Sequence, residues 1–267
     1  MTVLLQISDT HFGTEQAPVV AALQALSRAQ RPDLLVLSGD ITQRARRAQF
    51  DAARAFVDRL GAPRLAIPGN HDIPLFDLFA RLLHPYAGHR AAFGDDLEPE
   101  HSSADLLVVG VNTTRWYRHE NGAVSARQIE RVAERLTRAT PGQLRIVVVH
   151  HPVAVPDAGD AHNLLRNRNA ALRRWSESGA DLLMGGHIHL PCVIPLPELA
   201  RPMWAVQAGT AVSSRVRDGQ PNSVNLLRWG RDAPAGRCVI ERWDCGARGP
   251  EFVRATALEV TPARLPP

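Results

Sequence analysis

Short, wholly apolar segments recur through the first two thirds of the chain, and amphipathic helical segments separate several of them. The apolar segments are residues 3–7, 34–37, 65–67, 106–111, 146–149 and 182–184. The segments with helical character are residues 19–28, 48–60, 125–138 and 163–178. Strands that are apolar on both faces need cover on both faces. The alternation therefore predicts an α/β fold in which helices pack on both sides of a sheet.

The last third of the chain has a different pattern. Strand-like segments follow one another at residues 203–207, 224–229, 238–243 and 252–260, and no helical segment separates them. We expect them to add antiparallel or mixed strands to the same body. No linker or repeat interrupts the sequence, so we predict a single domain over residues 1–267.

Polar residues that can bind metal ions follow five of the apolar segments, at the point where each segment ends. They are Asp9 and His11, Asp40, Asn70 to Asp72, His150 and His151, and His187 and His189. In an open α/β sheet, the ligand crevice lies outside the carboxyl ends of the strands. We therefore expect these five groups of residues to meet in one site.

The spacing within these groups is consistent with a shared site. Asp9 and His11, like His187 and His189, are two residues apart, and extended backbone would point both members of a pair to the same side. A glycine precedes Asp40 and another precedes Asn70, which lets the backbone turn sharply as it leaves the strand. Nitrogen and oxygen ligands without thiolates suit Mn, Fe or Zn better than Mg or Ca.

As a set, these motifs resemble the calcineurin-like metallophosphoesterase superfamily. The motifs are Asp9-x-His11, Gly39-Asp40, Gly69-Asn70-His71-Asp72, His150 and Gly186-x-x-His189, and the resemblance covers residues 1–190. Within the superfamily, the chain is most similar to the bacterial class III cyclic-nucleotide-phosphodiesterase-like proteins. The resemblance implies a four-layered α/β/β/α sandwich with mixed sheets, in which residues 191–267 supply further strands of the second sheet.

The resemblance also implies a pair of divalent or mixed-valence metal ions. One would be held by Asp9, His11 and His189, and the other by Asn70, His150 and His187, with Asp40 bridging both. A shared carboxylate would hold the two cations roughly 3.5–4 Å apart, the separation used in two-metal hydrolysis.

The activity implied by the resemblance is hydrolysis of small phosphodiesters, with 3′,5′-cyclic nucleotides among the candidate substrates. A metal-bridging hydroxide would attack phosphorus, and His71 would assist the leaving group. Members of the superfamily often carry an acidic residue three positions after the bridging Asp, and this chain has Gln43 there. What orients His71 is therefore open, with Asp72 as one candidate. The alternatives are a nuclease-like enzyme acting on nucleic-acid ends and a non-catalytic, metal-binding scaffold.

Further residues are candidates for contact with substrate. Asn112 follows the segment that ends at residue 111, and Thr210 and Arg215 follow the segment at residues 203–207. His151 neighbours His150 and must point the other way along a strand, so we expect it to support the ligands instead of joining them. Arg44 and its neighbouring arginines are expected on a solvated helix face, which leaves no arginine cluster beside the ligand motifs.

Composition excludes several other classes of protein. All 31 basic residues are arginine, so a lysine Schiff base and a phosphate-binding loop with its lysine are ruled out. The net charge of +4 is mild and spread along the chain, which does not indicate a nucleic-acid partner. No apolar run approaches the roughly 20 residues that span a bilayer, and we expect residues 1–12 to be neither a secretory signal nor a membrane anchor. With three cysteines expected as reduced thiols, we expect a cytoplasmic protein of open oligomeric state, with which a homodimer is compatible.

Overall fold

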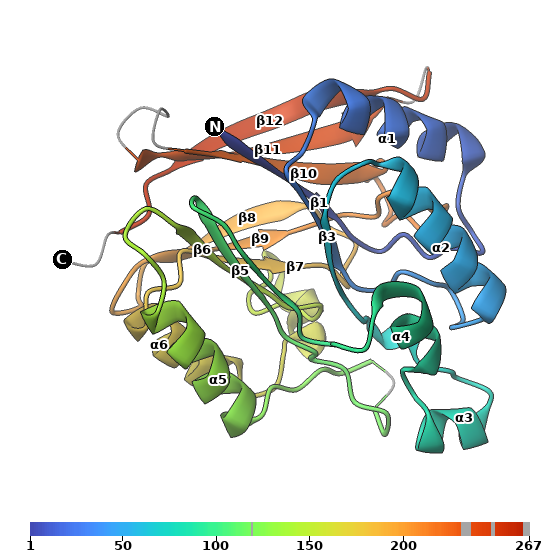
Figure 1. Cartoon of the computed structure of the whole chain (residues 1–267), viewed down its shortest axis with the longest axis horizontal. Coiled ribbons are helices and arrows are strands. Elements are labelled where there is room, and N and C mark those ends of the chain that lie inside the picture. The colour runs from blue at the N-terminus through green and yellow to red at the C-terminus, as the bar shows by residue number, and fades with distance from the viewer. Residues whose placement is uncertain (119, 231–235, 247–248, 264–267) are drawn as a thin grey trace.

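Two six-stranded mixed sheets form the centre of the molecule in the computed structural model, which describes residues 1–118, 120–230, 236–246 and 249–263 (Figure 1). The first sheet has the order β12-β11-β10-β1-β2-β3 and the second has the order β4-β5-β6-β7-β9-β8. The first contains β1 (Thr2–Ile7), β2 (Leu34–Ser38), β3 (Arg64–Ile67), β10 (Ser223–Trp229), β11 (Cys238–Cys245) and β12 (Phe252–Val260). The second contains β4 (Glu100–Ser102), β5 (Leu106–Gly110), β6 (Leu144–Val148), β7 (Leu182–Gly185), β8 (Cys192–Leu196) and β9 (Met203–Gln207).

Helices cover the outer faces of both sheets. The α-helices are α1 (Ala17–Gln30), α2 (Arg47–Arg59), α3 (Leu78–Leu83), α4 (Ala87–Phe93), α5 (Ala126–Thr137) and α6 (Arg168–Glu177). Two short 3₁₀ helices are η1 (Asn70–Asp72) and η2 (Ala158–Asn163). Figure 1 shows α1 and α2 beside the first sheet and α5 and α6 beside the second. Among the described residues, no helix is both long and apolar enough to cross a membrane.

Alternation along β1 divides its side chains between two apolar layers. Leu5 and Ile7 pack in a cluster with residues of α1 and α2, whereas Leu4 packs in a cluster with residues of the second sheet such as Ile146. A third cluster joins the outer face of the second sheet to α5 and α6. Three apolar layers between four layers of secondary structure confirm the predicted α/β/β/α sandwich.

The C-terminal strands are divided between the sheets, and the expectation that they all extend the second sheet is wrong. β8 and β9 do join the second sheet, but β10 pairs antiparallel with β1, and β11 and β12 continue outward from it. The physical reason lies at β1, which would otherwise leave one edge of the first sheet with unpaired backbone groups. Pairing with β10 satisfies that edge, and Leu227 enters the layer between the sheets.

Helix boundaries follow the local chemistry of the chain. Ser125 caps α5, because its hydroxyl accepts the amide N–H of Gln128 while the Gln128 side chain accepts the amide N–H of Ser125. The helix expected from residue 163 begins only at Arg168, because Asn167 adopts a left-handed conformation with φ of 65°. The short elements α3, α4, β4 and β8 are additional to the predicted ones.

The buried side chain of His89 in α4 is expected to make the fold less stable at acid pH. The side chain is fully buried, its ring lies 5.4 Å from that of Phe93, and neither ring nitrogen has a hydrogen-bond partner among the described residues. Burial, helped by the charge of Arg90, lowers the pKa of His89 to about 4. Because this pKa lies below that of the unfolded chain, stability is lost as pH falls below about 6.5, by roughly 2 kcal/mol at pH 5.

We therefore expect His89→Phe to remove part of the acid sensitivity. The apolar ring fits the aromatic surroundings and binds no proton, so the unfolding midpoint should rise by several degrees at pH 5 and change less at pH 8. Thermal unfolding followed by circular dichroism at both pH values measures this difference. An equal shift at the two pH values would contradict the assignment of the acid loss to His89.

Candidate metal centre

The five strand ends identified from the sequence meet at one place. The loops after β1, β2, β3, β6 and β7 bring together three groups of potential ligands whose donor atoms lie within 4.8 Å of one another. The groups are Asp9 with His11 and His189, His11 with Asp40 and His71, and Asp40 with His150 and His187. Parallel pairing of β1 with β2 and β3, and of β6 with β7, puts their carboxyl ends at the same edge of each sheet.

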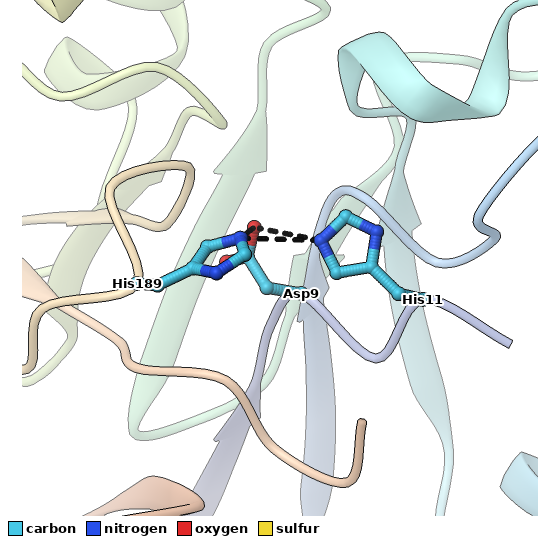
Figure 2. A group of neighbouring side chains, drawn as sticks. All are labelled: Asp9, His11 and His189. Atoms are coloured by element: carbon cyan, nitrogen blue, oxygen red, sulfur yellow. Dashed lines mark hydrogen bonds and ion pairs between the residues drawn. The ribbon is translucent and has the colours of Figure 1, made fainter. Parts of the chain in front are cut away.

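The first group combines residues from the two sheets (Figure 2). Asp9 and His11 follow β1, and His189 follows β7 of the other sheet. The Nε2 atom of His189 lies 3.3 Å from Asp9 Oδ1 and 3.2 Å from Nε2 of His11. Three donor atoms converge from different directions, as binding of one cation requires.

The second group lies around the amide oxygen of Asn70. His150 Nε2 is 3.1 Å and His187 Nδ1 is 3.0 Å from Asn70 Oδ1. His150 Nε2 is also 3.3 Å from Asp40 Oδ1. All of these side chains except His187 are almost completely buried.

Asp40 connects the two groups through its two carboxylate oxygens. Its Oδ1 lies near His150 of the second group, and its Oδ2 lies 3.8 Å from His11 Nε2 of the first group. Oδ1 also accepts the amide N–H of His71 at 2.8 Å, which fixes the carboxylate between the loops. A carboxylate in this position could contribute one oxygen to each of the two groups.

The backbone reaches these positions through left-handed conformations. Positive φ angles occur at Asp9 (51°), His11 (41°), Asp40 (50°), His187 (75°) and His189 (55°). The interpretation of the two-residue spacing as extended backbone is therefore wrong, and His187 and His189 belong to different groups. Left-handed conformations at residues other than glycine cost about 1–3 kcal/mol each and cluster at functional sites.

Two glycines allow the loops to approach closely. Gly39 has φ of 97°, and a Cβ atom there would lie 2.4 Å from the ring nitrogen Nδ1 of His150. Gly69 has ordinary extended backbone, but a Cβ atom there would lie 2.0 Å from the amide nitrogen of Asp40. The sharp turn expected at both positions applies to Gly39, whereas Gly69 is needed because the backbones nearly touch.

Carbonyl groups hold two of the histidines in a defined tautomer. Nδ1 of His150 donates to the carbonyl of Ser38 at 2.9 Å, and Nδ1 of His189 donates to the carbonyl of Arg215 at 2.6 Å. Each bond leaves Nε2 directed at the other ligands. Although burial opposes it, Asp40 raises the pKa of His150 to about 9 and Asp9 raises the pKa of His189, so binding of a metal ion displaces these protons. His151 is buried beside them, with Nδ1 2.8 Å from the hydroxyl of Thr113, in the supporting position expected of it.

Mutual attraction sets the charges in this buried cluster. Burial alone would raise the pKa of Asp9, but His189 and His150 lower it to about 2, and similar attraction holds the pKa of Asp40 well below its usual range. Burial lowers the pKa of His11 to about 3, so this ring is neutral at neutral pH. Ionised carboxylates and neutral imidazole are the forms that bind metal ions.

The donor set fits divalent cations. The Nε2 atoms of His11 and His189 lie 3.2 Å apart, and Nε2 of His150 lies 3.1 Å from the amide oxygen of Asn70. Electron pairs at these separations repel one another unless a proton or a cation lies between them. The groups around Asp9 and Asn70 each offer nitrogen and oxygen atoms, the combination that Mn, Fe and Zn accept.

His71 lies at the edge of the cluster, on a wall of a cavity of about 650 Å³. Its Nδ1 donates to the backbone carbonyl of Gln43 at 3.1 Å, and its ring stands edge-on to His11, with 4.8 Å between ring centroids. The backbone of Gln43 therefore takes the orienting role often given to a carboxylate. Arg215 Nη1 lies 3.4 Å from His71 Nε2 and donates to the side-chain oxygen of Gln43 at 2.8 Å.

Asp72, which the sequence suggested as a candidate to orient His71, is hydrogen-bonded to backbone groups instead. Its carboxylate accepts the amide N–H groups of Ile41, Thr42 and Gly69 at 2.7–3.0 Å. Burial raises the pKa of Asp72 to about 6, with the charge of Asp40 adding to the effect. Asp72 thus joins the loop of Asp40 to the loop of Asn70. Its carboxylate accepts these backbone N–H groups, and among the described residues the structure records no hydrogen bond between it and the His71 ring.

The expectation that no arginines gather beside the ligands is wrong. Arg44, Arg215 and Arg217 all line the cavity, although they lie in two distant parts of the sequence. Arg217 is paired with Asp160 at 2.8 Å, and Glu120 adds a second carboxylate to the wall. A helical-face pattern could not reveal this convergence, because Arg44 precedes α2 in a loop.

Of the three candidate substrate contacts, the structure places only Arg215 in the cavity wall. Asn112 lines a different cavity, and its Oδ1 accepts the hydroxyl and the amide N–H of Thr114. The hydroxyl of Thr210 donates to the carbonyl of Arg215 at 2.8 Å, the same carbonyl that holds His189. Thr210 therefore supports the backbone beside the site.

Comparisons with known proteins agree with this geometry. The Calcineurin-like phosphoesterase family matches residues 2–191. A probable cyclic nucleotide phosphodiesterase of Synechococcus sp. is 28% identical over 160 residues, which are 56% of this chain and 57% of that protein. The cAMP/cGMP dual specificity phosphodiesterase of Mycobacterium tuberculosis is 27% identical over 213 residues, 70% of this chain and 61% of that protein. The chain thus matches about three fifths of the length of these relatives.

A solved structure has the same fold. The crystal structure of a dimetal phosphatase from Danio rerio superposes with a TM-score of 0.68 and 16% sequence identity, over 98% of this chain and 99% of that chain. The family match contains every one of the converging ligand residues from Asp9 to His189. The chain therefore belongs to the calcineurin-like phosphoesterase family.

Proposed function

We propose that the chain hydrolyses small phosphodiesters with the help of two metal ions. Asp9, His11 and His189 would hold one ion, Asn70, His150 and His187 would hold the other, and Asp40 would be shared. The observation that carries the proposal is the position of Asp40, with one carboxylate oxygen near each ligand group and His71 beside it. Ligands come from both sheets, so the proposal treats residues 1–267 as one functional unit.

The ions would supply two things that the side chains cannot. When bound, they neutralise phosphoryl charge and lower the pKa of water, which provides a nucleophile at neutral pH. The nitrogen and oxygen donors favour Mn, Fe or Zn. The three cysteines are free thiols, as is usual in a reducing compartment, so we propose that the protein acts in the cytoplasm.

His71 would act on the leaving oxygen. Its Nδ1 faces the carbonyl of Gln43, so we assign the contact with the leaving oxygen to Nε2, which lies 3.4 Å from Arg215 Nη1. From there it can donate a proton or a hydrogen bond to the departing alkoxide. Nearby Arg215 would bind a phosphoryl oxygen, since no carboxylate lies within ion-pair distance of its guanidinium among the described residues.

The substrate class rests on the size of the cavity and on the curated relatives. About 650 Å³ is enough for a small organic phosphate. The curated relatives are named for cyclic nucleotide hydrolysis, which supports 3′,5′-cyclic nucleotides as the first substrates to test. A phosphodiester carries one negative charge, whereas a phosphomonoester carries up to two.

A substrate panel tests the proposed function directly. With Mn²⁺ added, we expect kcat/KM for bis(p-nitrophenyl) phosphate to exceed that for p-nitrophenyl phosphate, because the curated relatives of the chain are named as phosphodiesterases. The panel should include cyclic nucleotides, glycerophosphodiesters and single-stranded DNA. A phosphomonoester preference would contradict the diesterase assignment, and inactivity on every member would favour a non-catalytic scaffold.

Replacing Arg215 tests its proposed contact with phosphate. A charged hydrogen bond is worth about 1.5–3 kcal/mol, so Arg215→Gln should lower kcat/KM roughly 10- to 100-fold. Arg215→Lys should recover part of the loss, because it restores the charge without the planar group. Metal content is the control, since the backbone carbonyl that holds His189 remains in both variants. Unchanged kinetics in Arg215→Gln would remove this residue from the substrate site.

A further inference from the structure

We infer that a second cavity beside the metal centre receives the nucleobase of the substrate, an inference that rests on the proposed phosphodiesterase function. The second cavity has a volume of about 860 Å³ and lies between the start of α2, the segment after η1, and α4. Arg44 lines both this cavity and the metal cavity, so the two share a wall. Its walls include Arg44, Phe50, Phe76, Asp77, Gly88 and Ala91.

Two loops lead from the metal centre to the second cavity. In the loop after β2, Gln43 lines the metal cavity, Arg44 lines both and Ala45 lines the second. In the loop after β3, His71 lines the metal cavity and Pro74 lines the second. The second cavity therefore continues the metal cavity on the side of His71, where the leaving oxygen and its organic group would lie.

The wall of the second cavity suits a flat ring. Phe76 is 80% exposed, and the guanidinium of Arg44 lies 5.4 Å from the centre of its ring. On the inner side, Phe50 is buried, and α4 approaches it so closely that a Cβ atom at Gly88 would lie 2.4 Å from the Phe50 ring. Small residues on α4, including Ala91, leave the volume open.

Polar groups in the same wall distinguish a nucleobase from an alkyl group. Asp51 and Asp77 line the cavity together with Arg44, and one carboxylate oxygen of Asp77 accepts the amide N–H of Ala80 at 2.9 Å. An alkyl chain would remove these charged groups from water without replacing their hydrogen bonds, at a cost in free energy. A nucleobase offers a flat face for Phe76 and a polar edge for the charged groups, and base–aromatic stacking is favourable for every base.

The test compares two cyclic phosphodiesters that differ in the nucleoside. One is 3′,5′-cyclic AMP, and the other is the cyclic phosphate of 1,3-propanediol, which has the same six-membered phosphodiester ring and no base. Phe76→Ala removes the stacking surface, and Ala91→Trp fills the cavity from the exposed face of α4. Ala21→Trp, at an exposed alanine of α1, is the matched control.

We expect both second-cavity variants to lower kcat/KM for 3′,5′-cyclic AMP roughly 5- to 100-fold, the range that loss of one stacked base predicts. Hydrolysis of the propanediol cyclic phosphate should stay within about twofold of the wild type, as should both activities of Ala21→Trp. Equal losses on the two substrates, or no loss on either, would overturn the assignment.

Binding of adenosine to the full chain separates failure of this inference from failure of the proposed function. Calorimetry should detect adenosine binding to the wild type and to Ala21→Trp, and a weaker affinity in Phe76→Ala and Ala91→Trp. If the wild type hydrolyses neither diester but binds adenosine in this pattern, the second cavity is a nucleobase site and the phosphodiesterase proposal is wrong. If millimolar adenosine does not bind the wild type, the nucleobase assignment is wrong.

Discussion

Replacing Asp40 with alanine is expected to lower the metal content from about two ions per chain to one or none and nearly to abolish phosphodiester hydrolysis. The reason is that the two carboxylate oxygens lie near different ligand groups, with Oδ1 3.3 Å from His150 and Oδ2 3.8 Å from His11. Losing the shared ligand removes Lewis-acid stabilisation worth several kcal/mol, roughly a 10³-fold loss of rate. Elemental analysis of purified protein and kcat/KM for bis(p-nitrophenyl) phosphate measure both effects.

A carboxylate elsewhere in the same cavity provides the control. Asp160 lines the cavity but pairs with Arg217 and belongs to none of the converging ligand groups. Asp160→Asn should therefore keep both ions. If Asp40→Ala also keeps two ions, the idea of a shared carboxylate is wrong, whatever happens to the activity.

Replacing His71 with alanine is expected to slow hydrolysis without removing a metal ion. General acid–base catalysis contributes about 10²–10⁴-fold, so a loss in this range is expected for substrates that release an alkoxide. The loss should be smaller for p-nitrophenyl esters, because p-nitrophenolate is a weak base that leaves without a proton. The carbonyl of Gln43 orients the ring without the negative charge of a carboxylate, which favours the lower part of the range.

Metal content and leaving-group dependence decide between the roles of His71. His162→Ala is the matched control, because this exposed histidine lines the same cavity but belongs to none of the converging ligand groups, and the substitution should have little effect. Loss of an ion in His71→Ala would show that His71 is a metal ligand. The measurement is needed because His71 lies in one of the converging groups, with His11 and Asp40. Full activity of His71→Ala on substrates that release an alkoxide would show that His71 does not assist the leaving group.

The sequence could predict the location of the site because the relevant information is local. Each of β1, β2, β3, β6 and β7 is a short apolar run, and each ends at a residue that can bind a metal. Parallel pairing brings such ends to one edge whatever the details of the loops. Asp9 and His189, which are far apart in the sequence, were therefore expected together, and they lie 3.3 Å apart.

The rest depended on tertiary contacts that no local pattern contains. Left-handed backbone at Asp9 and Asp40 arises where the loops are pressed together, so the expectation of extended backbone failed. Arg44 and Arg217 line one cavity although they lie far apart in the sequence, and the residues around each of them do not predict that the two arginines meet. The choice of sheet for β10 depends on which edge is free in the folded protein.

The division of each ligand group between the two sheets links metal binding to folding. Asp9 and Asp40 follow strands of the first sheet, whereas His189 and His150 follow strands of the second. A bound ion is therefore a cross-link between two layers that are otherwise held together largely by apolar side chains. Any ion that binds only the folded chain adds RT ln(1 + [M]/Kd) to its stability, about 4 kcal/mol at a thousand times Kd. The proposed metal centre would thus also stabilise the fold. A substitution that removes one ligand would lower the free energy of unfolding of the sandwich as well as the affinity of the site for metal ions.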